Sequence, residues 1–161
     1  MIKWDTGLEK KFNEIIEPYK NNEEVQKMKK FMQHGSISTY KHCMKVAKMC
    51  FYVNHKYDLH IDDETLVIGA FLHDFYLYDW HNCKHITKLH GFEHPLFAAI
   101  NAKKVFNVAS TVLDIIKSHM WPLTITKVPK NKAALLVCIV DKYVASKETI
   151  DGIKHKISHF I

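Results

Sequence analysis

His73 and Asp74 stand side by side at the end of an apolar segment that runs from Leu66 to Leu72. Burying an imidazole and a carboxylate is costly unless hydrogen bonds, opposite charges or a metal ion satisfy them. Both side chains are common ligands of divalent transition metals. The doublet therefore predicts a metal site at the inner end of a helix, and with it metal-dependent hydrolysis.

Further candidate ligands recur on the apolar faces of other predicted helices. Each lies three or four residues from apolar residues, so the helical period turns it inward. They are His42, His94, His119 and Asp141. A single inward histidine can be an ordinary core residue with a hydrogen-bonded neighbour, but Asp is rarely fully buried without a partner. One shared metal centre would satisfy all of these groups, and we favour that interpretation.

The hydrophobic pattern repeats about every 3.6 residues along nearly the whole chain, which is typical of helices. We expect helices over residues 7–17, 23–33, 39–57, 63–74, 93–106, 110–120 and 131–145, with a weak C-terminal helix within 146–161. Pro18 should end the first helix, and Pro95 should lie in the first turn of the fifth. Ser38 or Thr39 should cap the third helix. Residues 75–92 should form a loop with room for a short helical turn. The expected fold is an all-α bundle of seven to eight helices.

Length and composition indicate one soluble globular domain. The chain has 161 residues, of which 47% are hydrophobic and 25% charged, and only five Gly and four Pro disfavour a turn-rich β fold. We expect a single domain over 1–161, with N-terminal helices in 1–34, a metal-binding core in 35–145 and a C-terminal helix in 146–161. No signal peptide, membrane-spanning run or CxxC spacing is apparent. These features predict a cytoplasmic protein with reduced thiols.

The charge pattern narrows the range of partners. The net charge is +6, and every one of the 23 basic residues is Lys. Nucleic-acid recognition favours the bidentate contacts of Arg, so a nucleic-acid partner is not expected. The positive charge would still attract a small anion such as a phosphate ester.

The order of the candidate ligands resembles the HD-domain superfamily, which is named after its His-Asp doublet. The resemblance covers about residues 35–145 and rests on His42, His73, Asp74, His94, His119 and Asp141. The segments 77–81, 90–95 and 119–123 are similar to a group of small bacterial HD proteins usually described as phosphohydrolases. The resemblance implies that His42, His73, Asp74 and Asp141 hold one metal. His94 and His119 would hold a second, with Asp74 bridging. His and carboxylate ligands suit Fe, Mn, Zn, Co or Ni.

Residues around the doublet are candidates for catalysis and substrate binding. Asp79 and His90 could act as acid or base beside the bridging Asp74. Substrate contacts could come from His34, His81, Lys84, Lys88 and Lys142. The aromatic residues Phe75, Tyr76, Tyr78 and Trp80 could form a wall that stacks a base, although core packing also explains them.

Three functions remain open at this point. The first is a phosphohydrolase that acts on a small phosphate ester, such as a nucleotide, with a metal-activated water. The second, implied by the same resemblance, is a mixed-valent di-iron oxygenase. The third is a non-catalytic nucleotide-binding regulatory domain. The complete ligand set favours an enzyme, and lysines and aromatic residues in 75–92 favour the hydrolase.

Overall fold

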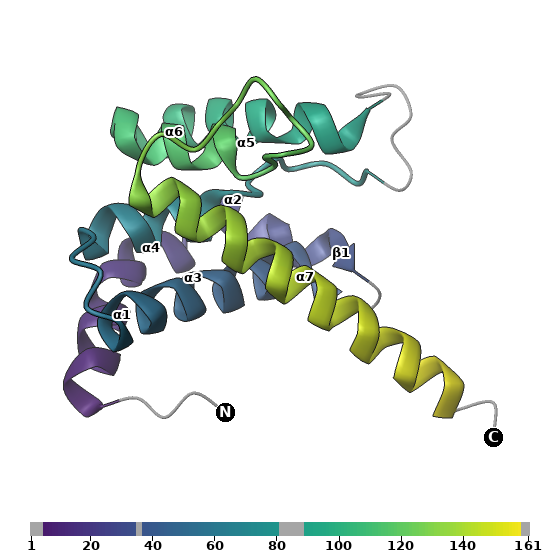
Figure 1. Cartoon of the computed structure of the whole chain (residues 1–161). Helices are drawn as coiled ribbons and strands as arrows, with labels where there is room; N and C mark the ends of the chain where they lie inside the picture. The colour runs from purple at the N-terminus through teal and green to yellow at the C-terminus, as the bar shows by residue number, and fades with distance from the viewer. Residues whose placement is uncertain (1–4, 35–36, 81–88, 159–161) are drawn as a thin grey trace.

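The computed structural model describes residues 5–34, 37–80 and 89–158, without the side chains of His34 and 155–158 (Figure 1). Within this part the chain is mainly helical. Its elements are α1 (Thr6–Lys20), α2 (Glu23–Lys27), the 3₁₀ helix η1 (Met28–Lys30), β1 (Met32–His34), β2 (Ile37–Ser38), α3 (Thr39–Lys56), α4 (Asp63–Leu72), α5 (His90–Phe106), α6 (Ser110–Ser118) and α7 (Lys132–Ser158). The prediction of an all-α bundle with about seven helices is confirmed.

Helix α3 lies at the centre of the bundle. It packs against α4 and α7, while α4 also packs against α6, and α5 packs against α6. In Figure 1, α5 and α6 form an upper layer over α3 and α4, α1 lies below, and α7 crosses the molecule diagonally. The core between these helices is fully buried, and its largest side chains include Phe12, Phe51, Phe71 and Phe75. Their burial holds together the helices that carry the candidate ligands.

Side-chain caps set the starts of the two helices next to the site. Ser38 accepts a hydrogen bond from the backbone N–H of Lys41, and Asp62 accepts one from Thr65 at 2.8 Å. Such caps satisfy N–H groups that have no partner inside the helix. The predicted starts of α3 and α4 are confirmed.

The predicted helix over 23–33 is wrong beyond Lys27. The chain there forms η1 and a short antiparallel hairpin of β1 and β2. The backbone N–H of Thr39 donates to the carbonyl of Phe31 at 2.8 Å, and the Trp80 indole N–H donates to the carbonyl of Met32 at 3.1 Å. These bonds favour the extended conformation, and helical periodicity does not reveal them.

Three other helices differ from expectation in length. Helix α1 continues through Pro18 to Lys20, so the prediction that Pro18 ends this helix is wrong. Pro18 lies in the last turn, where the missing N–H removes one hydrogen bond shortly before the helix ends. Helix α5 begins at His90, so Pro95 lies inside the helix and not in its first turn. Helix α7 is continuous from Lys132 to Ser158 and does not break near Ala145. Gly152 is the one Gly or Pro in its second half and costs about 1 kcal/mol relative to Ala, which a long helix tolerates. In Figure 1 the C-terminal half of α7 projects beyond the bundle.

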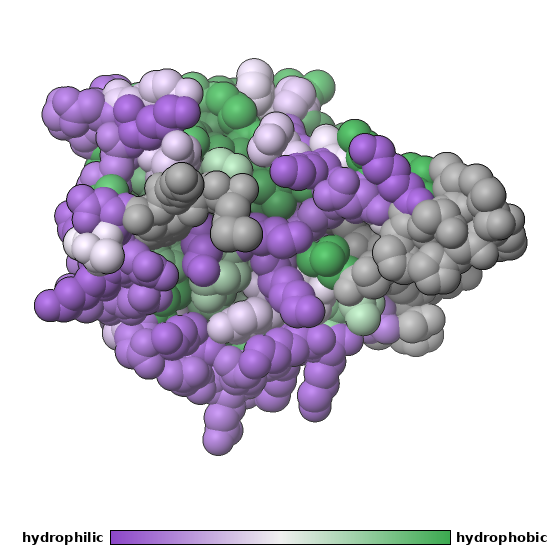
Figure 2. Space-filling view, turned by 90° about the horizontal axis from the view of Figure 1, so that it is seen from below, coloured by the Kyte–Doolittle hydropathy of each residue, from purple (hydrophilic) through white to green (hydrophobic). Residues whose placement is uncertain are grey.

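One face of the molecule is largely polar (Figure 2), and the described cysteines are free thiols. The face seen from below is mostly hydrophilic, with apolar side chains visible between the polar ones (Figure 2). Among the described residues no helix is both long and apolar enough to cross a membrane. Cys43, Cys50 and Cys138 are buried free thiols, and Cys83 lies outside the described residues.

Candidate metal centre

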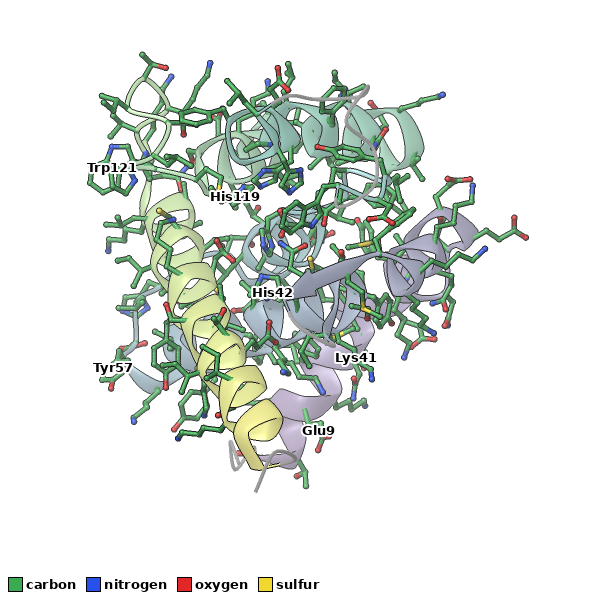
Figure 3. All side chains as sticks on the ribbon, turned by 90° about the vertical axis from the view of Figure 1, so that its right-hand side faces the viewer. Glu9, Lys41, His42, Tyr57, His119 and Trp121 are labelled. Carbon is green, nitrogen blue, oxygen red and sulfur yellow. The ribbon has the colours of Figure 1, made fainter. Side chains whose placement is uncertain are left out.

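All six predicted ligands converge in the interior, each carried by a helix or a helix end. They are His42 on α3, His73 and Asp74 directly after α4, His94 on α5, His119 directly after α6 and Asp141 on α7. Each is at most 7% exposed. In Figure 3, His42 and His119 lie inside the bundle, whereas the exposed Tyr57 lies at its periphery.

The backbone fixes the orientation of three of these imidazoles. His73 and His119 each cap a helix and donate Nδ1–H to the carbonyl three residues back, those of Ala70 at 2.8 Å and Ile116 at 2.7 Å. His94 donates Nδ1–H to the carbonyl of His90 at 2.8 Å. With the proton on Nδ1, the lone pair of each Nε2 points away from the backbone and toward the centre. This is the arrangement that orients histidine ligands at metal sites.

The Nε2 atoms and carboxylate oxygens meet within a small volume. His94 Nε2 lies 2.8 Å from His119 Nε2 and 3.1 Å from Asp74 Oδ1. His73 Nε2 lies 3.3 Å from Asp74 Oδ2 and 3.4 Å from Asp141 Oδ1. Three overlapping triads have ligand atoms within 4.8 Å of one another: His42–His73–Asp74, His73–His119–Asp141 and Asp74–His94–His119. His73, Asp74 and His119 each belong to two of these triads, so the three triads form one connected cluster.

The chemistry of these atoms fits a bound cation. Among the described residues, His73 Nε2 and Asp74 Oδ1 are buried without a hydrogen-bond partner, although both lie in close contact with other polar atoms. The facing Nε2 atoms of His94 and His119 both carry lone pairs when Nδ1 holds the proton, so they repel unless a cation lies between them. Buried unpaired acceptors are costly, and a divalent metal ion would satisfy all of them together.

Electrostatics keep the two carboxylates ionised. Burial alone would raise the pKa of Asp74, but His73 and His94 hold that pKa well below its usual range. Burial also acts to raise the pKa of Asp141, and the hydrogen bonds with His42 and His73 outweigh it and lower the pKa. Burial lowers the pKa of His119. In contrast, burial acts to lower the pKa of His73, but Asp74 and a hydrogen bond with Asp141 raise that pKa well above its ordinary value. A metal cation binds ionised carboxylates and neutral imidazoles, so it would displace the proton that these carboxylates favour on His73.

The comparisons with known proteins agree with this geometry. A family model for the HD domain matches residues 39–146. The chain belongs to the HD-domain family. Comparison with curated proteins gives no match, and neither does comparison with solved structures. All six candidate ligands fall within the HD match.

Two polar residues outside the HD match also contact the ligands, and the sequence patterns did not reveal them. Glu148 Oε2 accepts a hydrogen bond from His42 Nδ1 at 2.9 Å. Its other oxygen, Oε1, forms an ion pair with Lys45 Nζ at 2.7 Å. Burial lowers the pKa of His42, but hydrogen bonds to Asp141 and Glu148 raise it above its ordinary value. Glu148 follows Asp141 by seven residues, two helical turns. In a continuous helix this spacing places Glu148 on the same face as Asp141. The sequence predicts a helix end near Ala145, so Glu148 was not among the expected site residues.

Gln33 of β1 is the second residue outside the match. Its amide nitrogen donates to Asp74 Oδ2 at 2.5 Å, and its amide oxygen accepts from the Tyr76 hydroxyl at 2.6 Å. The Thr39 hydroxyl lies 3.3 Å from the same amide oxygen. No sequence signal pointed to Gln33, because the pattern placed it at the end of a helix.

The other predicted site residues differ in whether the structure describes them and in what they contact. The Lys142 ammonium donates to the carbonyls of His119 at 2.7 Å and Cys138 at 3.2 Å. In this structure it therefore links α7 to the end of α6. Asp79 is half-buried on the segment that follows Asp74. His81, Lys84 and Lys88 lie outside the described residues, as does the side chain of His34. Substrate binding by these residues stays a prediction.

The aromatic residues after the doublet are largely buried around His90. The His90 ring is stacked between Trp80, at 4.8 Å between ring centroids, and the ligand His94, at 4.6 Å. Its Nδ1 lies 2.9 Å from the Tyr78 hydroxyl. Phe75 is fully buried beside Phe106 and belongs to the core. The expected aromatic wall is thus mainly a packed support for His90 and His94.

Proposed function

We propose that this protein is a metal-dependent phosphohydrolase that acts on a small phosphate ester, with nucleotides as the first class to test. The observation that supports it is the buried His/Asp cluster of three overlapping triads inside an HD domain. The complete set of six candidate ligands favours an enzyme over a non-catalytic domain.

We further propose that two divalent ions bind. His42, His73, Asp74 and Asp141 would hold one, and His94 and His119 would hold the other with Asp74 between them. When bound, such ions supply Lewis acidity, which makes a water molecule acidic enough to react near neutral pH and offsets the charge of a phosphoryl group. Fe, Mn, Zn, Co and Ni all suit these ligands.

The protein's own groups prepare this centre for an anionic substrate. Asp74 and Asp141 would offset part of the charge of the bound cations, and the Gln33 amide holds one oxygen of Asp74 in place. His90 and Asp79 are the candidate proton donors to the leaving group. His90 is half-buried beside His94, and the Tyr78 phenol next to it stays protonated because burial and the charge of Asp74 raise its pKa.

The experiment that tests this function combines metal analysis with a screen for phosphate release. Anaerobically purified protein is analysed for metals, reloaded with Mn²⁺ or Zn²⁺, and assayed on nucleotides and phosphorylated metabolites without oxygen. We expect two metals per chain and phosphate release from at least one ester. At most one metal per chain under metal-replete conditions would contradict the two-ion proposal.

The same experiment separates hydrolysis from other chemistry. Oxygen consumption tied to substrate cleavage, dependent on iron and absent with other metals, would replace the hydrolase with an oxygenase. Nucleotide binding without turnover under every metal would indicate a regulatory domain. His90→Asn and Asp79→Asn should lower the rate of phosphate release while metal content stays unchanged, if these residues transfer protons.

A further inference from the structure

Glu148 is a buried carboxylate on the far side of a candidate metal ligand. Its side chain is 4% exposed, and one oxygen lies 2.9 Å from His42 Nδ1 while the other lies 2.7 Å from Lys45 Nζ. The other ring nitrogen of His42, Nε2, lies 2.9 Å from Asp141 Oδ1 at the centre. Because Glu148 and Asp141 contact opposite nitrogens of one imidazole, Glu148 does not face the centre itself.

A buried carboxylate in this position needs a second partner. Leaving Glu148 with His42 alone would bury a charge that a neutral imidazole does not neutralise. Lys45 supplies the opposite charge, and its side chain is 51% exposed, so its ammonium keeps part of its hydration. The three residues form a chain from the surface to the centre, in the order Lys45, Glu148, His42.

The cavity next to this chain does not offer a better explanation. It has a volume of about 610 Å³ between α1, α3 and α7. Its charged lining is balanced between three lysines and three carboxylates: Lys45, Lys48, Lys147, Glu9, Glu148 and Asp151. A balanced lining has no strong preference for an anion or a cation. The cavity therefore accounts for the exposure of Lys45 and gives no reason to assign a ligand.

We propose that Glu148 is the positioning residue for His42, and that Lys45 holds Glu148 in place. By accepting the Nδ1 proton, Glu148 keeps the Nε2 lone pair of His42 directed at the centre. Its negative charge also makes that imidazole a stronger donor to a cation. Backbone carbonyls accept the Nδ1 proton of His73, His94 and His119 in the same way. His42 is thus the one histidine among the candidate ligands whose Nδ1 partner is a carboxylate, and this partner lies outside the HD match.

This inference rests on the metal-binding part of the proposed function and not on hydrolysis. Its test is the affinity for Mn²⁺ alone, measured by equilibrium dialysis without substrate. Glu148→Ala should weaken one of the two Mn²⁺ sites by about 10–100-fold, the usual effect of losing such a partner. The other site, at His94 and His119, should keep its affinity. Glu148→Gln should lose less Mn²⁺ affinity than Glu148→Ala, because its amide oxygen still accepts a hydrogen bond from His42 Nδ1–H. Lys45→Met should also lose less Mn²⁺ affinity than Glu148→Ala, because Glu148 itself remains next to His42.

Lys147→Met is the matched control. Lys147 lines the same cavity, yet among the described residues it is not an ion-pair partner of Glu148. This variant should bind Mn²⁺ like the wild type. Wild-type affinity in Glu148→Ala would overturn the proposal. If Glu148→Ala does not fold, as judged by circular dichroism, Glu148→Gln and Lys45→Met decide, and wild-type affinity in both would overturn it.

The two proposals can fail separately. Protein that binds Mn²⁺ with the expected order of variants but hydrolyses no ester would contradict the hydrolase and leave the role of Glu148 standing. Wild-type protein that binds neither Mn²⁺, Zn²⁺ nor Fe²⁺ would contradict the metal site, and the role of Glu148 with it.

Discussion

The HD domain and the segments on either side of it contribute to the candidate metal centre in different ways. Residues 39–146 supply every candidate ligand. The chain before residue 39 supplies Gln33, which contacts Asp74, and the chain after 146 supplies Glu148, which contacts His42. The family pattern thus provides the atoms that would hold a metal. The flanking segments provide contacts that orient two of them.

The two regions also differ in packing. Helices α3, α4 and α6 of the HD domain surround a core of fully buried side chains such as Phe71 and Ile115. In contrast, the end of α7 exposes Ile150 and Ile153, which are 51% and 54% exposed. Substitutions in this core should therefore cost more stability than substitutions at the end of α7.

The largest effect should come from Asp74 in the HD domain. Asp74→Ala removes the carboxylate shared by two triads and leaves both candidate ions with less compensating charge. We expect phosphate release to fall below detection, a loss of more than about 100-fold. Elemental analysis should show a larger loss of metal than for His119→Ala, which removes a ligand of one ion. Full activity and metal content in both variants would refute the site assignment.

Metal removal should lower stability through the same centre. The buried ligand atoms lose their shared partner, and a metal that binds only the folded state adds about 2.7 kcal/mol at a free concentration 100 times its Kd. For a chain of this size we expect the melting temperature to fall by roughly 5–10 °C. Thermal melts with and without a strong chelator measure the change. An unchanged midpoint after verified metal removal would mean that the ligands satisfy one another.

The HD domain was the part that the sequence predicted well. Each ligand helix has a clear apolar stripe, and a polar group that continues the stripe must be buried with its neighbours. His42 and Asp141 were found in this way, and the doublet was recognised by its position after α4. The family model confirms the resemblance over most of the chain.

The flanks were predicted less well because their structure depends on distant contacts. The hairpin that carries Gln33 is held by bonds to Trp80 and Asp74, more than 40 residues away. Periodicity detects local helix formation and gives no information about such bonds. Glu148 was missed for another reason: the helix was expected to end near Ala145, where no breaker stands.

Two of the helical glycines, Gly69 and Gly152, compare packing in the HD domain and at the end of α7. Gly69 lies on α4, where an added Cβ would meet Ile115 Cδ1 at 2.6 Å and Cγ2 at 3.0 Å. Gly69→Ala should destabilise the protein by about 1–2 kcal/mol, because overpacking exceeds the gain in helix propensity. Gly152 on α7 has open space around it, so Gly152→Ala should stabilise by about 0.5–1 kcal/mol. Chemical denaturation measures both. Equal effects would contradict the difference in packing.

Among substitutions next to the centre, the smallest effect should come from Gln33, which tests whether the N-terminal flank does more than cover the centre. Gln33→Ala removes the donor to Asp74 Oδ2 and the acceptor of the Tyr76 hydroxyl. Gln33 is 9% exposed, so water can replace part of its side chain, and we expect a loss of about 1 kcal/mol in stability. Metal affinity or activity should fall about 10-fold, the low end for a residue that contacts a ligand. The control is Gln26→Ala, because the amide of Gln26 on α2 donates to the carbonyl of Lys20 and not to a ligand. If both variants bound metal equally well, Gln33 would be only a structural contact, and the centre would be oriented from the C-terminal flank alone.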